Sequence, residues 1–420
     1  MQMRAEPMSC LRPTPERAAS FASLPYDVFD RRSAAAYVEA HPDSFLAIDR
    51  PETAFPPDQD MYAPEVYAKA AELLRARAQD GTLLRDATPC YYVWRLEQGG
   101  HAQTGIACAC AVDEYLDGTI RRHEGTTAAK EADRIEHIRA TGAQTGPIFL
   151  CYRDNYAIDV LVRAAAQASP LYDFTDGEGV RQTMWRIARP AAVEALRACF
   201  QTVPCAYIAD GHHRAASAVH LSLERRRADG RPEGACAKGD ERPYDLFLSV
   251  LFPASQLRVL PYDRVLFDTA GLTPEDLLRG LDQAGFDLMG EGPSFAVPGA
   301  RHEFGLFVGG SWHGLRLRDP ETLPEGDPVA RLDAGILQDR VLGPLLGIDD
   351  PRTSERIRFV GGVEGTGRLE ELAGAGGAAF SLFPTSVGEL MAVSDAGRLM
   401  PPKSTWFEPK LRSGLLIRRI

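Results

Sequence analysis

One segment near the middle of the chain combines residue types that bind anions. It consists of Asp210, Gly211, His212, His213 and Arg214. An apolar run, residues 206–209, precedes it and an alanine-rich stretch follows it, so the pattern predicts a strand, a tight turn and the start of a helix. A helix start presents free backbone N–H groups and the positive end of the helix dipole, which together favour phosphate.

Each residue type in this segment has a role in such a site. Gly211 allows close approach of the backbone, and Arg214 is able to make a bidentate contact with a phosphate group. The alternative is a helix N-terminus capped by Asp210, with both histidines half-buried against their neighbours. We favour the phosphate site, because two histidines and an arginine after Asp-Gly have little structural purpose.

A second candidate site begins at His123 and Glu124. It resembles the start of a His-Glu-x-x-His zinc motif, but Thr127 stands where the second histidine is required, so a metalloprotease is not expected. Beside histidine and arginine, Glu124 is expected to stay ionised and to suit proton abstraction from an alcohol.

The helix predicted over residues 126–141 carries a row of basic side chains. Lys130, Arg134 and His137 are spaced i, i+4 and i+7, so they share one face. This face either neutralises phosphate or is a solvated surface with i,i+4 ion pairs.

Near the end of the chain, Lys403, Ser404 and Thr405 form a third candidate site. Consecutive hydroxyls after a lysine are able to bind phosphate oxygens or to support a metal ion. The alternative is a simple turn after two prolines. The sequence contains no Walker A loop, dinucleotide-binding Gly-x-Gly-x-x-Gly unit or Gly-x-Ser-x-Gly elbow, so phosphate chemistry here uses none of the common cradles.

Composition limits the class of protein. The 420 residues carry a net charge of −11, which argues against sequence-independent binding of nucleic acid. None of the eight cysteines belongs to a Cys-x-x-Cys pair, and most are expected to be buried free thiols. Without a signal peptide or an apolar run near 18 residues, we expect a cytoplasmic protein that does not enter a membrane.

The predicted elements include helices over residues 34–40, 63–79 and 190–200, and a pair of strands, residues 91–97 and 103–112, around a turn at residues 98–100. Their order indicates an α+β protein with mixed sheets. Residues 1–20 are expected to be loosely attached, residues 21–245 to form the catalytic region, and residues 246–420 to form a C-terminal α+β region whose tail returns to the site. A charged stretch at residues 224–242 is predicted to be a surface loop. Glycine-rich residues 362–379 show no period.

Taken together, the candidate motifs resemble a widespread bacterial family of uncharacterised proteins. The resemblance rests on Asp210–Arg214, His123-Glu124 and residues 403–410, and it spans residues 20–420. Further segments that fit are Pro25–Val28, Ser44–Leu46, Gln103–Gly105 and Tyr152–Asp154. The His-Glu and Asp-Gly-His-His-Arg motifs are also similar to those of free serine kinases in the ParB/sulfiredoxin-like superfamily.

That similarity implies a ParB/sulfiredoxin-like core with N- and C-terminal elaborations, and phosphorylation of free L-serine by ATP, ADP or pyrophosphate with Mg²⁺. It implies that Glu124 is the general base, beside His123, and that Asp210–Arg214 binds the donor phosphates. In the mechanism that we expect on this basis, His212 protonates the leaving phosphate. On weaker grounds, Lys403–Thr405 adds phosphate contacts. The stretch from Glu124 to Asp210 is longer than in the compact ParB core, which predicts an inserted element.

Two other classes of function stay open. One is a ParB-like nucleotide-binding regulator, although the sequence shows neither a basic patch nor a helix-turn-helix. The other is a non-catalytic protein that binds a partner, in which Glu124 is dispensable.

Overall fold

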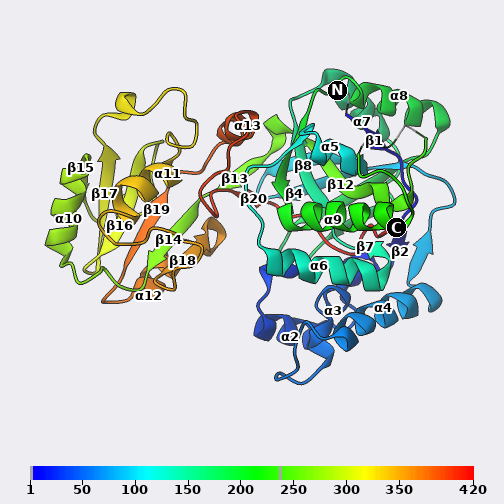
Figure 1. Ribbon diagram of the computed structural model, residues 1–420, viewed down its shortest axis with the longest axis horizontal. Coiled ribbons are helices and arrows are strands. Elements are labelled where there is room, and N and C mark those ends of the chain that lie inside the picture. The colour runs from blue at the N-terminus through cyan, green and yellow to red at the C-terminus, as the bar shows by residue number, and fades with distance from the viewer. Residues whose placement is uncertain (1–2, 235, 237–238) are drawn as a thin grey trace. The chain divides into compact units, whose positions relative to one another are not determined.

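The computed structural model describes residues 3–234, 236 and 239–420 (Figure 1). The chain forms two compact units, and both are discontinuous in sequence. Unit 1 comprises residues 1–121, 126–257 and 409–420, and unit 2 comprises residues 122–125 and 258–408. Both contain helices and sheets, which confirms the expected mixture of the two.

Unit 1 is built on a nine-stranded mixed sheet. Along the sheet the strands are β6 (Ile120–Arg121), β11 (Ala206–Asp210), β8 (Ile148–Tyr152), β12 (Leu246–Pro253), β5 (His101–Ala111), β4 (Tyr91–Gln98), β10 (Arg181–Ile187) and β9 (Tyr172–Thr175), with β1 (Ala5–Glu6) paired to β5. The β11–β6 and β12–β8 pairs are parallel and the other pairs are antiparallel. The sequence predicted the hairpin β4–β5. In the structure its turn residues Gly99 and Gly100 both take the positive φ that a tight hairpin turn needs.

Helices cover this sheet, with α9 crossing in front of the strands in Figure 1 and α6 packed beside it. The helices of this group are α5 (Val112–Leu116), α6 (Ala128–Thr141), α7 (Tyr156–Ala165), α8 (Pro190–Phe200) and α9 (His212–Ala228). The segment between Glu124 and Asp210, predicted to hold an insertion, supplies α6, α7, α8, the hairpin β9–β10, β8 and the short strand β7 (Ala143–Gln144).

The N-terminal residues are firmly packed, which differs from the expected loose start. Met3, Ala5 and Cys10 are fully buried or nearly so. Strand β1 joins the large sheet, β2 (Leu11–Pro13) pairs with β3 (Leu83–Arg85), and α1 (Ala18–Phe21) follows. The prolines and polar residues of this segment left no periodic pattern from which such short strand pairs could be predicted. Met1 and Gln2 lie outside the described residues.

A layer of helices follows this start and packs against α6. Its members are the 3-10 helices η1 (Tyr26–Val28) and η2 (Pro51–Ala54) and the helices α2 (Arg31–Ala40), α3 (Leu46–Asp49) and α4 (Pro64–Gln79). Helices α2 and α4 were predicted. Asp30 caps α2 through the Ser33 N–H, and Pro64 occupies the first position of α4, where a proline is well tolerated.

Unit 2 is built on a six-stranded antiparallel sheet. Its order is β15 (Phe286–Glu291), β17 (Ser311–Leu317), β16 (Glu303–Val308), β19 (Ala378–Leu382), β14 (Tyr262–Leu266) and β18 (Ile357–Gly361), and β13 (Arg258–Leu260) pairs separately with β20 (Trp406–Glu408). The main helices are α10 (Pro274–Gln283), α11 (Asp333–Leu337), α12 (Thr366–Ala373) and α13 (Val387–Asp395). The remaining turns are η3 (Pro243–Asp245) and η4 (Ala254–Gln256) in unit 1, and η5 (Pro293–Phe295), η6 (Pro320–Thr322), η7 (Gln338–Leu342) and η8 (Gly362–Glu364) in unit 2.

Three features of this organisation differ from the sequence-based expectation. The division falls after Leu257 and not after Asp245, because β12 is an interior strand of the first sheet. The last segment, residues 409–420, belongs to unit 1, where β21 (Arg418–Arg419) pairs with β7. The glycine-rich stretch 362–379 contains the helix α12.

Candidate functional site

The predicted strand–turn–helix junction exists as β11, Gly211 and α9. The strand is buried up to Ala209, and Gly211 turns the chain with φ +92°, a left-handed conformation that glycine adopts at little cost. Helix α9 then begins at His212. Asp210 does not occupy the N-cap position, because Gly211 does. The alternative of a helix capped by Asp210 is therefore wrong.

Arg214 holds this turn from the inside. Its Nη2 donates to Asp210 Oδ2 at 2.6 Å, and its Nη1 donates to the carbonyl of Pro147. A Cβ atom on Gly211 would lie 3.0 Å from Arg214 Nε, so the guanidinium packs directly against the glycine. Burial lowers the pKa of Arg214, but the nearby charges, Asp210 first, outweigh it and raise the pKa above its ordinary value. Both terminal nitrogens of the Arg214 guanidinium therefore bind the backbone and side chains around the turn.

The two histidines of the junction differ in environment. His212 is buried, with 5% of its surface exposed. His213 is half-buried, and its Nε2 accepts a hydrogen bond from the Thr127 N–H at 3.2 Å. That bond uses the Nε2 lone pair, so His213 is neutral and carries its proton on Nδ1 while the bond is formed. The junction is thus linked to the residue that precedes α6.

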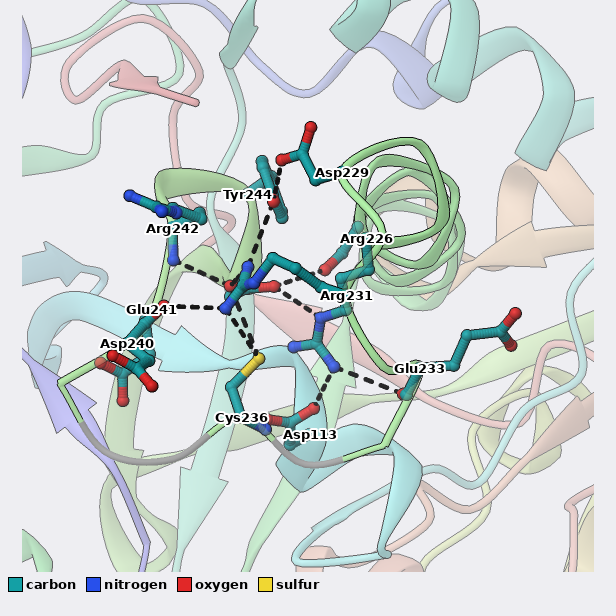
Figure 2. A network of polar contacts seen from close by, with 12 residues as sticks. Asp113, Arg226, Asp229, Arg231, Glu233, Cys236, Asp240, Glu241, Arg242 and Tyr244 are labelled. Carbon is teal, nitrogen blue, oxygen red and sulfur yellow. Dashed lines mark hydrogen bonds and ion pairs between the residues drawn. The ribbon is translucent and has the colours of Figure 1, made fainter.

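The far end of α9 is fixed by a buried charge network (Figure 2). Arg226 is fully buried and donates to Asp113 and Asp245, each at 2.6 Å. Arg231 reaches Asp245 at 2.7 Å and Cys236 Sγ at 3.2 Å. Residues 224–228, predicted to start a surface loop, are instead the last turn of α9. Because buried ion pairs hold their geometry, this network fixes the helix whose other end carries the candidate site.

The predicted basic face of α6 is mostly closed to solvent. Lys130 is exposed, whereas Arg134 and His137 are buried. Arg134 lies 3.9 Å from the Tyr26 ring centroid and pairs with Asp133 at 2.8 Å. Burial, followed by the charge of Arg134, lowers the pKa of His137, so this imidazole is neutral at neutral pH. The row is therefore not an open cationic surface.

Arg134, His137 and Arg214 nevertheless meet around one space inside unit 1. They line a cavity of about 30 Å³ together with Asp49 and Thr145, whose side chains are joined by a 2.8 Å hydrogen bond. A cavity of this size has room for one ordered water. Several charged and polar side chains thus lie buried behind the junction, and sequence reasoning did not identify Asp49 or Tyr26 among them.

Unit 2 brings together the other two candidate motifs. His123 Nε2 lies 3.2 Å from Thr405 Oγ1, and the His123 carbonyl accepts from the Met400 N–H at 2.8 Å. Ser404 Oγ donates to the Pro401 carbonyl at 2.7 Å, which fixes the turn. Residues 122–125 and 403–405, some 280 positions apart in the chain, therefore belong to one site.

An aromatic and an arginine side chain support this second site. Arg264 donates to the carbonyls of Lys403 and Pro402 at 3.0 and 3.2 Å, and burial lowers its pKa to about 10. Lys403 Nζ lies 5.7 Å from the ring centroid of Tyr262. Burial raises the pKa of Tyr262, with Glu124 adding to the effect and Lys403 opposing it. Sequence reasoning missed Tyr262 and Arg264; their signal was a charged pair, Asp263-Arg264, inside an otherwise apolar strand.

The structure therefore sorts the candidate residues into two sets. Unit 1 holds Asp210–Arg214, Lys130, Arg134 and His137, and unit 2 holds His123, Glu124 and Lys403–Thr405. Among residues 3–234, 236 and 239–420, no three His, Cys, Asp or Glu side chains are grouped as a metal site. All eight cysteines are free, and six of them are buried.

Comparison with known sequences identifies the family. The chain belongs to the family described as "Protein of unknown function (DUF1015)", which matches residues 5–335. This confirms the expected membership of an uncharacterised family. No curated protein matches the sequence. Within the described part of the chain, no helix has the length and apolar character needed to cross a bilayer.

Several solved structures are similar at low identity. One is a free serine kinase in complex with AMP, with 14% identity, a TM-score of 0.35, and coverage of 72% of this chain and 86% of that one. Another is SbnI with a C-terminal truncation from Staphylococcus aureus, with 12% identity, a TM-score of 0.40, and coverage of 74% and 87%. A conserved hypothetical protein from Pyrococcus furiosus has 14% identity, a TM-score of 0.34, and coverage of 73% and 92%.

Proposed function

We propose that this chain is a phosphotransferase that phosphorylates a small alcohol, with free L-serine as the first acceptor to test and O-phospho-L-serine as its product. The observation that carries the proposal is the turn at Gly211. It has a left-handed glycine, is locked from behind by Arg214, and opens a helix of 17 residues. The start of such a helix presents backbone N–H groups and the positive end of the helix dipole, which favour the donor phosphates of ATP, ADP or pyrophosphate.

The proposed roles at the junction follow its contacts. The backbone of Gly211 and the first turn of α9 bind the donor, beside His212 and His213. Arg214 acts as a positioning residue, because its guanidinium nitrogens bind Asp210 and Pro147. It also supplies a fixed positive charge behind the turn that does not titrate near neutral pH.

The acceptor alcohol is proposed to bind beside Glu124, which is next to His123 in the sequence. In the proposed reaction Glu124 takes the hydroxyl proton of the alcohol while the alcohol oxygen forms a bond to the transferring phosphorus. The bond from that phosphorus to the leaving phosphate oxygen breaks, and His212 returns a proton to the leaving group. Lys403 and Thr405 add positive charge and a hydroxyl donor for phosphate oxygens. Transfer of this kind needs mainly positioning and charge stabilisation from the protein.

Magnesium is expected to arrive with the donor. Since the described residues hold no group of three acidic, cysteine or histidine ligands, the ion would be bound chiefly by donor phosphate oxygens and water, as Mg²⁺ often is. When bound, it neutralises phosphate charge. We also propose that the sheet of unit 1 corresponds to a ParB-like core and that the protein acts in the cytoplasm.

The test incubates the full chain with L-serine, Mg²⁺ and each of ATP, ADP and pyrophosphate, and measures phosphoserine. The Glu124→Gln variant is expected to lose at least 100-fold in turnover, in the range typical of general-base removal, while donor affinity is retained. Glu39→Gln, on the exposed surface of α2, is the matched control and is expected to keep full activity.

Each alternative function corresponds to a distinct result. Donor binding without turnover in either direction would support the alternative that the protein is a ParB-like nucleotide-binding regulator. Neither binding nor turnover would leave a non-catalytic protein that binds a partner. Full activity of Glu124→Gln would remove this residue from the role of base.

A further inference from the structure

Unit 1 contains a second pocket that none of the roles above uses. It lies where η1, η2 and the start of α4 meet the first turns of α6, the region where the N-terminal helices pack under α6 in Figure 1. The pocket encloses about 170 Å³. This is smaller than the roughly 300–1,000 Å³ of sites for drug-sized ligands, so it suits one small metabolite and not a nucleotide.

Six charged side chains line the pocket, and four of them form two ion pairs. Arg50 Nε lies 2.5 Å from Glu52 Oε1, and its Nη1 donates to two backbone carbonyls of the η1 segment. Arg134 pairs with Asp133 at 2.8 Å, and Asp133 also accepts from the Tyr67 hydroxyl at 3.0 Å. These two pairs build the wall of the pocket and leave no net charge there.

The other two charges, Asp27 and Lys130, belong to neither of these pairs. Asp27 comes from η1 and Lys130 from the first turn of α6, and both are exposed. One carboxylate and one ammonium group in a pocket of this size complement a small zwitterion, because each would meet the opposite charge of the ligand.

The rest of the lining is aromatic or apolar. Tyr26 lies under Arg134, and Tyr67 is buried with its hydroxyl engaged by Asp133. Tyr62 is 53% exposed and stands beside Met61 at the rim. When a half-exposed aromatic ring beside a pocket packs against a ligand, apolar surface of both is removed from water, and this burial contributes favourably to the binding free energy.

We propose that this pocket binds a free α-amino acid with an aromatic or large apolar side chain. The ligand carboxylate pairs with Lys130, its ammonium group pairs with Asp27, and its side chain lies against the tyrosines. Tyr26 and Arg134 also line the cavity behind Arg214, so the occupied pocket is one layer of side chains away from the turn at Gly211. An effect of the ligand on donor binding rests on the proposed function, whereas the binding itself does not.

The experiment measures binding of L-phenylalanine to the full chain by calorimetry, without donor or turnover. Three probes each lack one feature: 2-phenylethylamine lacks the carboxylate, 3-phenylpropionate lacks the ammonium group, and L-serine lacks the apolar side chain. Each is expected to bind at least tenfold more weakly than L-phenylalanine. Equal affinity for L-serine, or no saturable binding of L-phenylalanine, overturns the proposal.

Two variants locate the site. Lys130→Met is expected to lower the affinity for L-phenylalanine at least tenfold and to leave the affinity for 2-phenylethylamine unchanged. Asp27→Asn is expected to lower the affinity for L-phenylalanine at least tenfold and to leave the affinity for 3-phenylpropionate unchanged. Two controls lie outside the pocket lining: Lys69→Met, at a half-buried lysine that pairs with Glu72, and Asp58→Asn, at an exposed position. Both variants are expected to bind L-phenylalanine normally. Unchanged affinity in Lys130→Met and Asp27→Asn contradicts the assignment. A silent kinase assay with intact phenylalanine binding would refute the phosphotransferase alone.

Discussion

At the scale of single residues, Gly211 and Arg214 depend on each other. The glycine takes a left-handed conformation, and the space that its missing Cβ leaves is filled by the guanidinium that binds Asp210. A side chain at position 211 would therefore meet two obstacles, backbone strain and a displaced arginine. The residues of the motif therefore pack against one another, and Arg214 fixes the conformation of the turn through its contacts with Asp210 and Gly211.

Gly211→Ala is expected to lower the free energy of unfolding by more than the roughly 1–2 kcal/mol that a left-handed alanine costs, because its Cβ would lie 3.0 Å from Arg214 Nε. Urea unfolding measures this loss, and titration with pyrophosphate measures the expected weaker donor binding. Gly118→Ala is the matched control: its φ is +81° and no atom lies within 4 Å of the added Cβ. Equal losses in the two variants would show that the contact with Arg214 is unimportant.

Asp263 is a buried acid whose protonation is linked to the stability of unit 2. Burial raises the pKa of this carboxyl from 3.8 to about 7, although the Leu382 N–H and Arg264 oppose the shift. The folded state thus holds the proton more tightly than the unfolded state. Its stabilising contribution is complete below about pH 4 and is lost as the pH rises through 7.

Asp263→Asn is expected to flatten this dependence, because the amide is neutral at every pH and its oxygen still accepts from Leu382. Each tenfold change in proton affinity is equivalent to about 1.4 kcal/mol. Hydrogen exchange of unit 2 amides at pH 5 and pH 8 gives the measurement, with the exposed Asp339→Asn as control. An identical pH dependence in the two variants would contradict the assignment.

At the scale of elements, α9 is held at both ends by arginine. Arg214 fixes its start, and Arg226 fixes its last turns to α5 and to the residue before β12 (Figure 2). Burial raises the pKa of Asp245, but hydrogen bonds from the Arg242 N–H, Arg231 and Arg226 outweigh it and keep the pKa below its ordinary value. The orientation of the junction thus depends on a charge network at the opposite end of the helix.

Arg226→Met is expected to destabilise unit 1 by about 3–5 kcal/mol, because it leaves the carboxylates of Asp113 and Asp245 buried without their main partner. Chemical unfolding measures the change. Arg227→Met, one residue along, removes an exposed ion pair with Glu233 and is expected to cost less than about 1 kcal/mol. A loss of that small size in Arg226→Met would mean that the network contributes little.

The elements that sequence reasoning found are those whose signals are local. The hairpin β4–β5 is specified by Gly99-Gly100, and α8 begins and ends as predicted because Pro190 opens it and its apolar period continues to Phe200. Helix α12 was missed because four glycines follow or interrupt its short apolar period. The inward contacts of Arg214 were missed because the partner carbonyl, Pro147, lies 67 residues away.

At the scale of the whole molecule, the two units exchange segments that no local pattern predicts. Residues 122–125 leave unit 1 and join unit 2, and residues 409–420 return to unit 1. The strand pairs nearest the ends of these segments, β13–β20 within unit 2 and β7–β21 within unit 1, join positions more than a hundred residues apart and are only two or three residues long. Such strands carry too few residues for a period to show, so the sequence predicts the candidate motifs but not the unit to which each belongs.

The returning segment is expected to support unit 1 alone. Leu415, Leu416 and Ile417 are fully buried, Ile417 exchanges two 2.9 Å backbone hydrogen bonds with Leu11, and Arg412 binds Asp176 at 2.8 Å. Ile417→Ala should therefore cost about 2–5 kcal/mol, through lost burial and a cavity beside the N-terminal strands.

Hydrogen exchange resolved along the chain distinguishes the two units in this variant. Amides of residues 3–121 and 126–257 are expected to exchange faster in Ile417→Ala, while those of residues 258–408 keep their protection. Ile420→Ala, at the less buried last position, serves as the control and should leave both patterns unchanged. Equal acceleration in both units would mean that they unfold as one cooperative body, because local destabilisation spreads only where the parts of a fold open together.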